Sequence, residues 1–256
     1  MSAPGDAGCE ILSWDTEFFG RKIARVRGDR LTPDALAQVD RWCEQAGIEC
    51  LYFLARADDP QTVRTAEQGG FGLVDIRMTL SRSGEFTTVV SAAREPAARI
   101  REVKPEDIGA LETIAKEAHR NTRFFADGNF SRQRAEALYV TWIRKECEGG
   151  AQKVFVAVSP EDRAIGYVTC HQEASGARGQ IGLIAVDRKA SGRGVGSCLI
   201  LAGLEWFASA GAGEVRVVTQ GNNLSALRLY ERQGFVAREL QLWFHKWYPI
   251  VDRAHV

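Results

Sequence analysis

One stretch of the chain, residues 181–207, constrains the fold more than any other. It begins with a short apolar run, Ile181 to Val186, that is rich in β-branched residues and typical of a buried strand. A polar segment follows, and then glycines stand at every second position from Gly192 to Gly196. Apolar residues recur at helical spacing from Leu199 to Phe207. The pattern predicts a strand, a glycine-rich turn and a helix.

The predicted turn has the properties of a phosphate site. Glycines let the backbone take left-handed conformations and come close to a ligand, and the first N–H groups of a helix point out of its positive end. The backbone N–H groups of Gly192 to Ser197 are therefore expected to hold a phosphate. The spacing fits neither GxxxxGK[ST] nor GxGxxG. A glycine-rich turn without a ligand is the alternative interpretation.

Two motifs, taken in order, resemble the signature of the GNAT superfamily of N-acetyltransferases. The first, Ser191-Gly-Arg-Gly-Val-Gly196, is similar to the acyl-CoA pyrophosphate loop of that family, [QR]xxGxG followed by Gly or Ala. Ser191 stands where the family usually has Gln or Arg. The second runs from Asn223 through Tyr230 to Phe235 and matches the pattern NxxAxxLYxxxGF at every fixed position.

The resemblance implies an α/β (α+β) fold with a central mixed sheet flanked by helices. Residues 100–256 are expected to form this GNAT domain, 1–80 a smaller α/β unit before it, and the polar stretch 81–99 a linker. Segments 66–80 and 230–244 share a helix end, a Gly-Phe turn and an alternating strand, which suggests that the first unit is a truncated GNAT-like copy. The alternative is that any helix-to-strand turn looks like this.

Local signals predict several element boundaries. Glu10 to Trp14 is expected as a strand, and residues 32–46 as an amphipathic helix with Thr32 as its cap. Residues 119–130 are expected to form a loop rich in aromatic and basic side chains. Ser131 is expected to cap the next helix.

The cofactor implied by the resemblance is acetyl-CoA. Its pantetheine arm would lie between splayed strands, Tyr167 to Gln172 and Gly182 to Val186. Backbone N–H groups near Ala185 and Val186 would hold the acetyl carbonyl as its oxygen gains charge. The cofactor-binding residues are expected to be Ile184, Ala185, Val186, Ser191, Gly192, Arg193, Gly194, Val195, Gly196, Ser197 and Asn223.

Tyr230 is the general acid that the resemblance implies, because a phenol is protonated at neutral pH and can donate to the departing thiolate. On spacing alone it is a core aromatic of an amphipathic helix. Asn223 is either a helix cap, a cofactor contact, or both. The base that takes the proton of the substrate ammonium is unresolved. Its candidates are His119, His171 and Glu173, with a water chain as the alternative.

Within the family, the sequence most resembles GNAT enzymes that acetylate the amine of a nucleotide-linked amino-dideoxy sugar. The nucleotide that this resemblance implies is dTDP. The resemblance rests on WDTEFFG near the start and LWFHKWY near the end as well as on the two motifs. Arginine forks suit a diphosphate, and aromatic faces suit a base or a sugar. The expected substrate-binding residues are Arg120, Arg123, Phe124 and His171, with Phe125 and Phe130 nearby. The alternative is a solvated loop whose phenylalanines pack on the core.

Two other functions stay open. One is a GNAT enzyme acting on an amino acid, a peptide N-terminus or an aminoglycoside, although the basic loop disfavours a polycation. The other is a non-catalytic acyl-CoA-binding sensor. The sugar, the position of its amine, and the choice between dTDP and UDP are not readable from the sequence.

Composition limits the partners. The chain has 33 Lys plus Arg against 33 Asp plus Glu, so we expect no nucleic-acid or anionic-membrane partner. The start of the chain has no signal-peptide pattern and no apolar run is long enough for a membrane span, which favours a cytoplasmic protein. Six scattered cysteines are expected as free thiols, and no metal site is expected. The apolar segment LWFHKWYPI suggests a buried tail or a homodimer contact.

Overall fold

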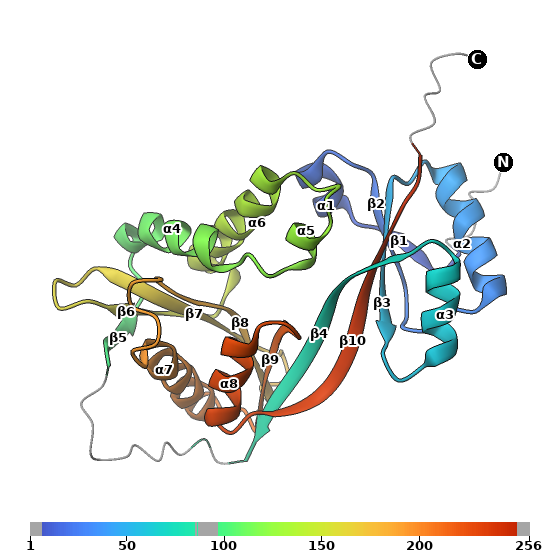
Figure 1. Cartoon of the computed structure of the whole chain (residues 1–256). Coiled ribbons are helices and arrows are strands. Elements are labelled where there is room, and N and C mark those ends of the chain that lie inside the picture. Colours follow the sequence, from blue (N-terminus) through green and yellow to red (C-terminus); the bar gives the residue numbers. More distant parts are fainter. Residues whose placement is uncertain (1–6, 85, 87–96, 250–256) are drawn as a thin grey trace. The chain divides into compact units, whose positions relative to one another are not determined.

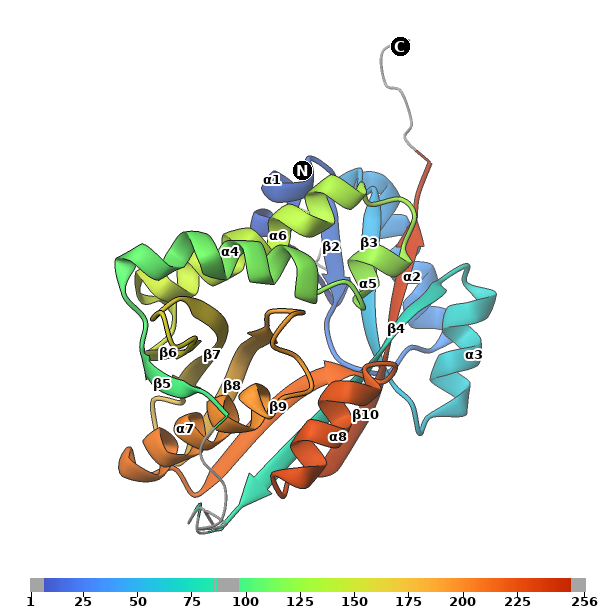
Figure 2. The same cartoon turned by 60° about the vertical axis from the view of Figure 1, so that its left-hand side comes forward.

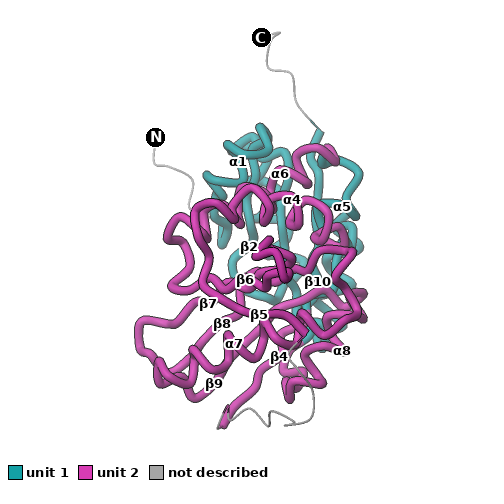
Figure 3. The backbone as a smooth tube through the Cα atoms, turned by 90° about the vertical axis from the view of Figure 1, so that its left-hand side faces the viewer, with its two compact units in different colours: residues 1–77, 123–130, 240–256 teal, residues 78–122, 131–239 magenta. Residues whose placement is uncertain are grey.

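The computed structural model describes residues 7–84, 86 and 97–249. The chain forms two compact units, coloured separately in Figure 3. Unit 1 comprises Met1–Arg77, Arg123–Phe130 and Leu240–Val256, and unit 2 comprises Met78–Thr122 and Ser131–Glu239. Two later segments of the chain thus belong with the N-terminal residues. The domain boundaries expected from the sequence, 1–80, 81–99 and 100–256, stay a prediction.

Unit 1 has strands in the order β1-β2-β3-β10. β1 (Cys9–Ile11) is antiparallel to β2 (Ile23–Val26), and β2 is parallel to β3 (Cys50–Arg56). β3 pairs antiparallel with Gln241–Trp247 of β10 (Val236–Trp247). The apolar segment near the C-terminus is therefore, as far as Trp247, a strand of this unit. The helices of unit 1 are α1 (Ser13–Phe19), α2 (Pro33–Ala46), α3 (Pro60–Gln68) and α5 (Arg123–Ala126).

The predicted cap of α2 is confirmed. The hydroxyl of Thr32 accepts a hydrogen bond from the N–H of Ala35, and Pro33 occupies the first helical position. The strand expected at Glu10 to Trp14 is wrong beyond Ile11, because α1 begins at Ser13. That helix ends where Gly20 takes the left-handed conformation with φ of 65°.

Unit 2 has strands in the order β4-β9-β8-β7-β6-β5, with β8 and β9 parallel and the pairs from β5 to β8 antiparallel. Its helices α4 and α6 lie on one face of the sheet and α7 lies on the other (Figures 1 and 2). The predicted mixed sheet flanked by helices is confirmed. The strands are β4 (Gly72–Ser83, in this unit from Met78 on), β5 (Arg99–Glu102), β6 (Lys153–Val158), β7 (Ala164–Gln172), β8 (Arg178–Val186) and β9 (Glu214–Gln220). The helices are α4 (Ile108–Ala118), α6 (Arg132–Lys145), α7 (Val195–Ser209) and α8 (Leu224–Arg232).

Short helical turns extend two of these helices. A 3₁₀ turn, Pro105–Asp107, leads into α4, and a π turn, Glu146–Gly150, follows α6. Ser131 caps α6 as predicted, since its hydroxyl accepts from the N–H of Arg134. The segment expected as a loop at 119–130 contains the short helix α5, so that expectation is wrong in part.

The core of unit 2 explains why α7 is apolar on most sides. Leu199, Leu204 and Phe207 of α7 are fully buried and belong to the same cluster as Val168 of β7 and Val217 of β9. Along β9 buried and partly exposed residues alternate with the period of a strand that has one face in the core. This packing fixes the position of α7 on the sheet and so the position of its N-terminus relative to β8.

The two helix–Gly–Phe–strand segments have the same local geometry. Gly70 and Gly234 have φ of 80° and 78°, and the next residues, Phe71 and Phe235, are buried. Glycine is favoured at both turns because other residues take this backbone conformation only with strain. Descent of the first unit from a GNAT copy stays a prediction.

The cysteines of the chain, which all lie in the described part, are free thiols as expected. None of the helices among the described residues combines the length and apolar character that crossing a bilayer requires.

Candidate active site

The glycine loop joins β8 to α7. Gly192 and Gly194 have φ of 77° and 90°, a left-handed conformation that favours glycine at both positions. Helix α7 begins at Val195 with Gly194 as its N-cap, and no side chain caps it. Among the described residues, the N–H groups of 192–196 donate to no carbonyl oxygen, whereas the N–H of Ser197 donates to the carbonyl of Gly194. The loop therefore offers a cluster of backbone donors at the positive end of a helix.

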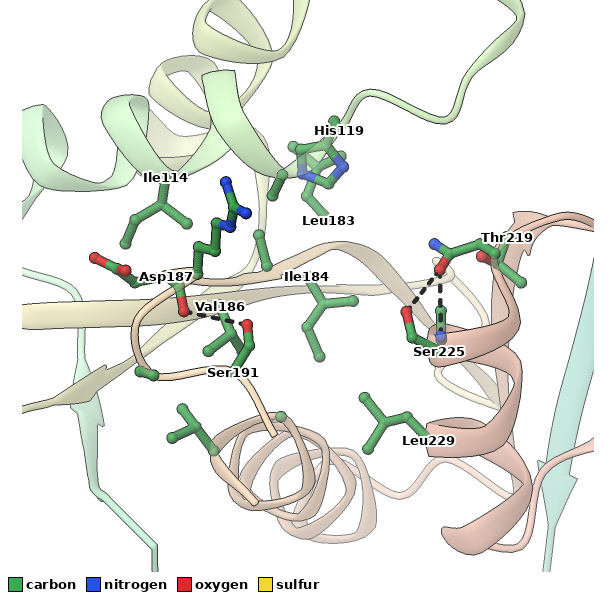
Figure 4. Close-up of a pocket in the computed structure, with 18 of the residues that line it drawn as sticks. Ile114, His119, Leu183, Ile184, Val186, Asp187, Ser191, Thr219, Ser225 and Leu229 are labelled. Carbon is green, nitrogen blue, oxygen red and sulfur yellow. Dashed lines mark hydrogen bonds between the residues drawn. The ribbon is translucent and has the colours of Figure 1, made fainter. Parts of the chain in front are cut away.

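Asp187 holds the start of this loop. Its carboxylate accepts from the N–H of Lys189 at 2.7 Å, and its carbonyl accepts from the N–H of Ala190 at 2.9 Å. The hydroxyl of Ser191 donates to the same carbonyl at 3.2 Å, as Figure 4 shows. Ser191, which replaces the usual Gln or Arg of the motif, thus stabilises the loop from within.

The splayed strands are β8 and β9, and the expectation that they are Tyr167 to Gln172 and Gly182 to Val186 is wrong. β7 pairs with β8 along its length, with a bulge where the N–H of Leu183 donates to the hydroxyl of Thr169 at 2.8 Å. The parallel pairing of β8 with β9 stops at Ile181 opposite Val217. Beyond that point the edge of β8 faces open space.

The hydrogen-bond pattern between β7 and β8 also shows which N–H groups of β8 face that space. The N–H of Asp187 donates to the carbonyl of Ile165, so this pair is a hydrogen-bonded one. Hydrogen-bonded and non-bonded pairs alternate in antiparallel strands. It follows that the N–H groups of Val186 and Ile184 point away from β7, whereas that of Ala185 points toward it. The backbone N–H groups of β8 that are open toward this space are therefore those of Ile184 and Val186.

Helix α8 supplies the other wall of this space. The side-chain oxygen of Asn223 caps the helix, accepting from the N–H of Ala226 at 3.3 Å and from the hydroxyl of Ser225 at 3.0 Å. A Cβ at Gly196 would lie 3.0 Å from the side chain of Leu229, so glycine permits α7 and α8 to pack closely. Tyr230 is buried, and burial raises its pKa well above the usual value of a phenol.

These elements enclose a cavity of about 1770 Å³ within unit 2, part of which Figure 4 shows. Arginines 120, 188, 193 and 232 line it together with the carboxylates of Glu117 and Asp187, so its charge suits an anion. The open N–H groups and the space beside Gly192, where an added Cβ would meet nothing within 4 Å, fit the pyrophosphate of acetyl-CoA. The predicted residues that line the cavity are Ile184, Ala185, Val186, Ser191, Gly192, Arg193, Gly194, Val195, Gly196, Ser197, Asn223, Tyr230 and Arg120.

The side of the cavity formed by α4 and α6 contains residues that sequence reasoning missed. Tyr139 and Trp142 line it, with ring centroids 5.2 Å apart, and His119 stacks on Tyr139 at 4.5 Å. Glu117 lies on the same helix end as His119. The only sequence signal was the spacing of Tyr139 and Trp142 by one helical turn, which is equally typical of a core.

Of the three candidates for a base, His119 alone is among the described residues that line the cavity. Burial lowers its pKa to about 4, so it is neutral at pH 7. His171 instead places Nε2 at 2.9 Å from a carboxylate oxygen of Glu146, and Glu173 forms an ion pair with Arg178 at 3.0 Å.

Arg123 and Phe124 belong to unit 1. The guanidinium of Arg123 lies over the rings of Trp243 and Tyr52, at 4.0 and 4.2 Å from their centroids. Phe124 is buried and stacks on Phe19 at 5.2 Å. Both side chains therefore contribute to an aromatic cluster of unit 1, and their substrate role stays a prediction.

Asp127 fixes the segment that carries these two residues. One of its carboxylate oxygens accepts from His245 Nδ1 at 2.7 Å and from Trp247 Nε1 at 2.9 Å, and the other accepts from Asn129. These donors outweigh burial and lower the pKa of Asp127 to about 2. Burial lowers the pKa of His245 to about 4. The pair is therefore a carboxylate and a neutral imidazole at pH 7.

Comparison with known proteins shows similarity to acetyltransferases. The model of the Acetyltransferase (GNAT) family matches residues 111–235. The chain is 30% identical over 254 residues to dTDP-fucosamine acetyltransferase of Escherichia coli O6:H1 (strain CFT073), which covers 95% of this chain and all of that protein. It is 38% identical over 103 residues to mycothiol acetyltransferase of Gordonia bronchialis, which covers 40% of this chain and 32% of that protein.

A solved structure of a GCN5-related N-acetyltransferase from Sphaerobacter thermophilus has the same fold, with a TM-score of 0.61 and 18% identity. The match covers 97% of this chain and 79% of that one. The chain is thus an acetyl-CoA-dependent acetyltransferase and belongs to the GNAT family.

Proposed function

We propose that this enzyme acetylates the amine of a nucleotide-linked amino-dideoxy sugar, with dTDP as the nucleotide. The observation that carries the proposal is the full-length similarity to a protein named dTDP-fucosamine acetyltransferase, since that similarity includes the residues before the GNAT motifs. The similarity to a mycothiol acetyltransferase spans less than half of this chain. The similarity to the dTDP-fucosamine acetyltransferase covers more of this chain than the similarity to the mycothiol acetyltransferase, so it is the better guide to the substrate.

The charge of the cavity supports an anionic acceptor. Four arginines against Glu117 and Asp187 line it, whereas an aminoglycoside is a polycation and would favour the opposite balance. Arg120 lies just after α4; its side chain is 49% exposed, and its guanidinium is 4.0 Å from the carboxylate of Glu136. A pairing this long and exposed is weak. Arg120 is therefore proposed to bind the diphosphate of the sugar nucleotide.

Residues of the glycine loop are proposed to hold the cofactor. The N–H groups of 192–196 would bind its pyrophosphate, and Arg188 and Arg193 would add positive charge. Acetyl-CoA supplies an activated acetyl group as a thioester. The N–H groups of Ile184 and Val186 would donate to the carbonyl oxygen as it gains charge, which is worth several kcal/mol when such donors are preorganised.

Tyr230 is proposed to stabilise the departing thiolate. Its raised pKa lies above that of an ordinary thiol, ~8.5. A thiolate is therefore too weak a base to remove the phenolic proton, and Tyr230 would act chiefly by donating a hydrogen bond. The proton that finally reaches sulfur would then come from the amine, directly or through water.

Release of free CoA from acetyl-CoA tests the proposal. The purified protein would be assayed with dTDP- and UDP-linked amino sugars, with amino acids and with an aminoglycoside. Selective turnover of one dTDP-amino sugar is the expected result. Turnover of amino acids or the aminoglycoside alone would reject the nucleotide-sugar assignment, and acetyl-CoA binding without turnover of any amine would favour a non-catalytic sensor.

A further inference from the structure

A buried tyrosine determines how His119 presents its ring to the cavity. Tyr167 lies on β7 with no exposed surface, and its hydroxyl is 2.9 Å from Nε2 of His119. Within the described part of the chain, this contact is the one hydrogen bond of that hydroxyl. His119 caps the end of α4, and its ring is stacked on Tyr139 with 16° between the ring planes. The ring is thus held on one face and at one nitrogen.

The direction of this hydrogen bond follows from the need of the buried hydroxyl for an acceptor. If His119 donated from Nε2, the proton of Tyr167 would be buried and would have no acceptor among the described residues. If Tyr167 donates to Nε2, its proton is satisfied. Buried polar hydrogens without partners are rare in proteins, so Tyr167 donates. Nε2 is then the unprotonated nitrogen, and the proton of the neutral ring must be on Nδ1.

Nδ1 is the ring nitrogen of His119 that the contact with Tyr167 leaves open. It has no hydrogen-bond partner among the described residues, and it is not one of their buried unpaired polar atoms. The residue lines the cavity at the end of α4, above Leu183 of β8 in Figure 4. This nitrogen is consequently accessible to an acceptor substrate.

We propose that His119 is a fixed Nδ1–H hydrogen-bond donor for an oxygen of the acceptor substrate, with Tyr167 as the residue that positions it, and that His119 is not the base that deprotonates the amine. A ring whose open nitrogen already carries a proton cannot accept another there while it stays neutral. The oxygen would be a hydroxyl or phosphate oxygen of the acceptor, and this part of the inference rests on the proposed function.

The tautomer can be measured without any substrate. Long-range ¹H–¹⁵N correlation spectra of protein with labelled histidine distinguish protonated from unprotonated ring nitrogens, and the missing signals of His119→Asn assign His119 among the four histidines. We expect an unprotonated Nε2 and a protonated Nδ1 at pH 7. In Tyr167→Phe, Nε2 loses its donor and the population should shift toward Nε2–H. A wild-type ring protonated at Nε2 would overturn the proposal.

Two substitutions of His119 distinguish a role as a hydrogen-bond donor from a role as a general base. Asparagine places an amide N–H near the position of Nδ1, and glutamine places one near Nε2, while neither can act as a base. We expect His119→Asn to keep kcat/KM for the acceptor within about fivefold of wild type and His119→Gln to lose about tenfold or more, the cost of one hydrogen bond. The Kd for acetyl-CoA should be unchanged in both. Equal large losses of kcat in the two variants would show a base and overturn the proposal.

These experiments separate the inference from the proposed substrate. If the nucleotide sugar is wrong, the tautomer result is unaffected, and the two variants would be compared on whichever amine is turned over. If the tautomer is wrong, turnover of the dTDP-amino sugar is unaffected.

Discussion

Replacing Gly192 by alanine should weaken acetyl-CoA binding far more than it destabilises the fold. Gly192 has φ of 77°, and an added Cβ would meet nothing within 4 Å. In the absence of ligand, the alanine variant should therefore lose only the free energy of placing a residue with a Cβ in the left-handed conformation, about 1–2 kcal/mol. Gly211, at the end of α7, has φ of 82° and equally open surroundings. Gly211→Ala is the matched control, since it has the same strain but is not part of the cavity lining.

The effect on binding follows from what the loop offers. The methyl group would enter the open space beside the N–H groups of 192–196, where the pyrophosphate is expected. Loss of one hydrogen bond to a charged group costs about 1.5–3 kcal/mol. The Kd for acetyl-CoA should therefore rise about 10- to 150-fold in Gly192→Ala. In Gly211→Ala it should stay within about twofold of wild type.

Isothermal titration calorimetry with acetyl-CoA, combined with urea unfolding of each variant, would measure both quantities. We expect similar losses of unfolding free energy in the two variants and weaker binding in Gly192→Ala alone. An unchanged Kd in Gly192→Ala, or equal weakening in both variants, would refute the assignment of the loop to the pyrophosphate.

Three further predictions concern α8 and unit 1. Tyr230→Phe should lower kcat about 10- to 100-fold, because a hydrogen bond to a charged group is lost, and leave the Kd for acetyl-CoA nearly unchanged; full activity would remove Tyr230 from the mechanism. Asn223→Ala should cost about 1 kcal/mol of unfolding free energy through loss of the helix cap, measured by urea unfolding; no loss would argue against capping. Between pH 6.5 and about 4, His245 binds fewer protons in the folded state than in the unfolded state. Its contribution to the stability of the fold is therefore complete above pH 6.5. The unfolding free energy should fall by roughly 3 kcal/mol as the pH drops from 6.5 to about 4. Thermal unfolding of His245→Gln should depend less on pH in this range, and an identical dependence would contradict the burial of a neutral imidazole.

The features predicted correctly from the sequence depend on neighbouring residues. The cap at Thr32, the cap at Ser131 and the left-handed glycines before α7 all follow from side chains or backbone angles within a few residues. The motif from Asn223 to Tyr230 likewise forms one helix with its own cap. Such local features can be predicted from the sequence because the residues that form the pattern are also the residues that make the hydrogen bonds of the cap or turn.

The features missed or misassigned depend on pairing between distant segments. Periodicity could not tell that β8 separates from β9 instead of β7, because the periodicity of a strand does not specify which neighbour it pairs with. Nor could it place Tyr167 against His119, which are 48 residues apart. The same holds for the segment 123–130, whose Asp127 bonds to side chains of β10.

The identity of the reaction product tests the proposed function most directly. Mass spectrometry after incubation with acetyl-CoA and the preferred dTDP-amino sugar would be combined with measurement of the CoA released. We expect one acetyl group on the amine of the intact nucleotide sugar for each CoA formed. CoA released without acetylated sugar, or acetylation only of the free amino sugar that lacks the nucleotide, would contradict it.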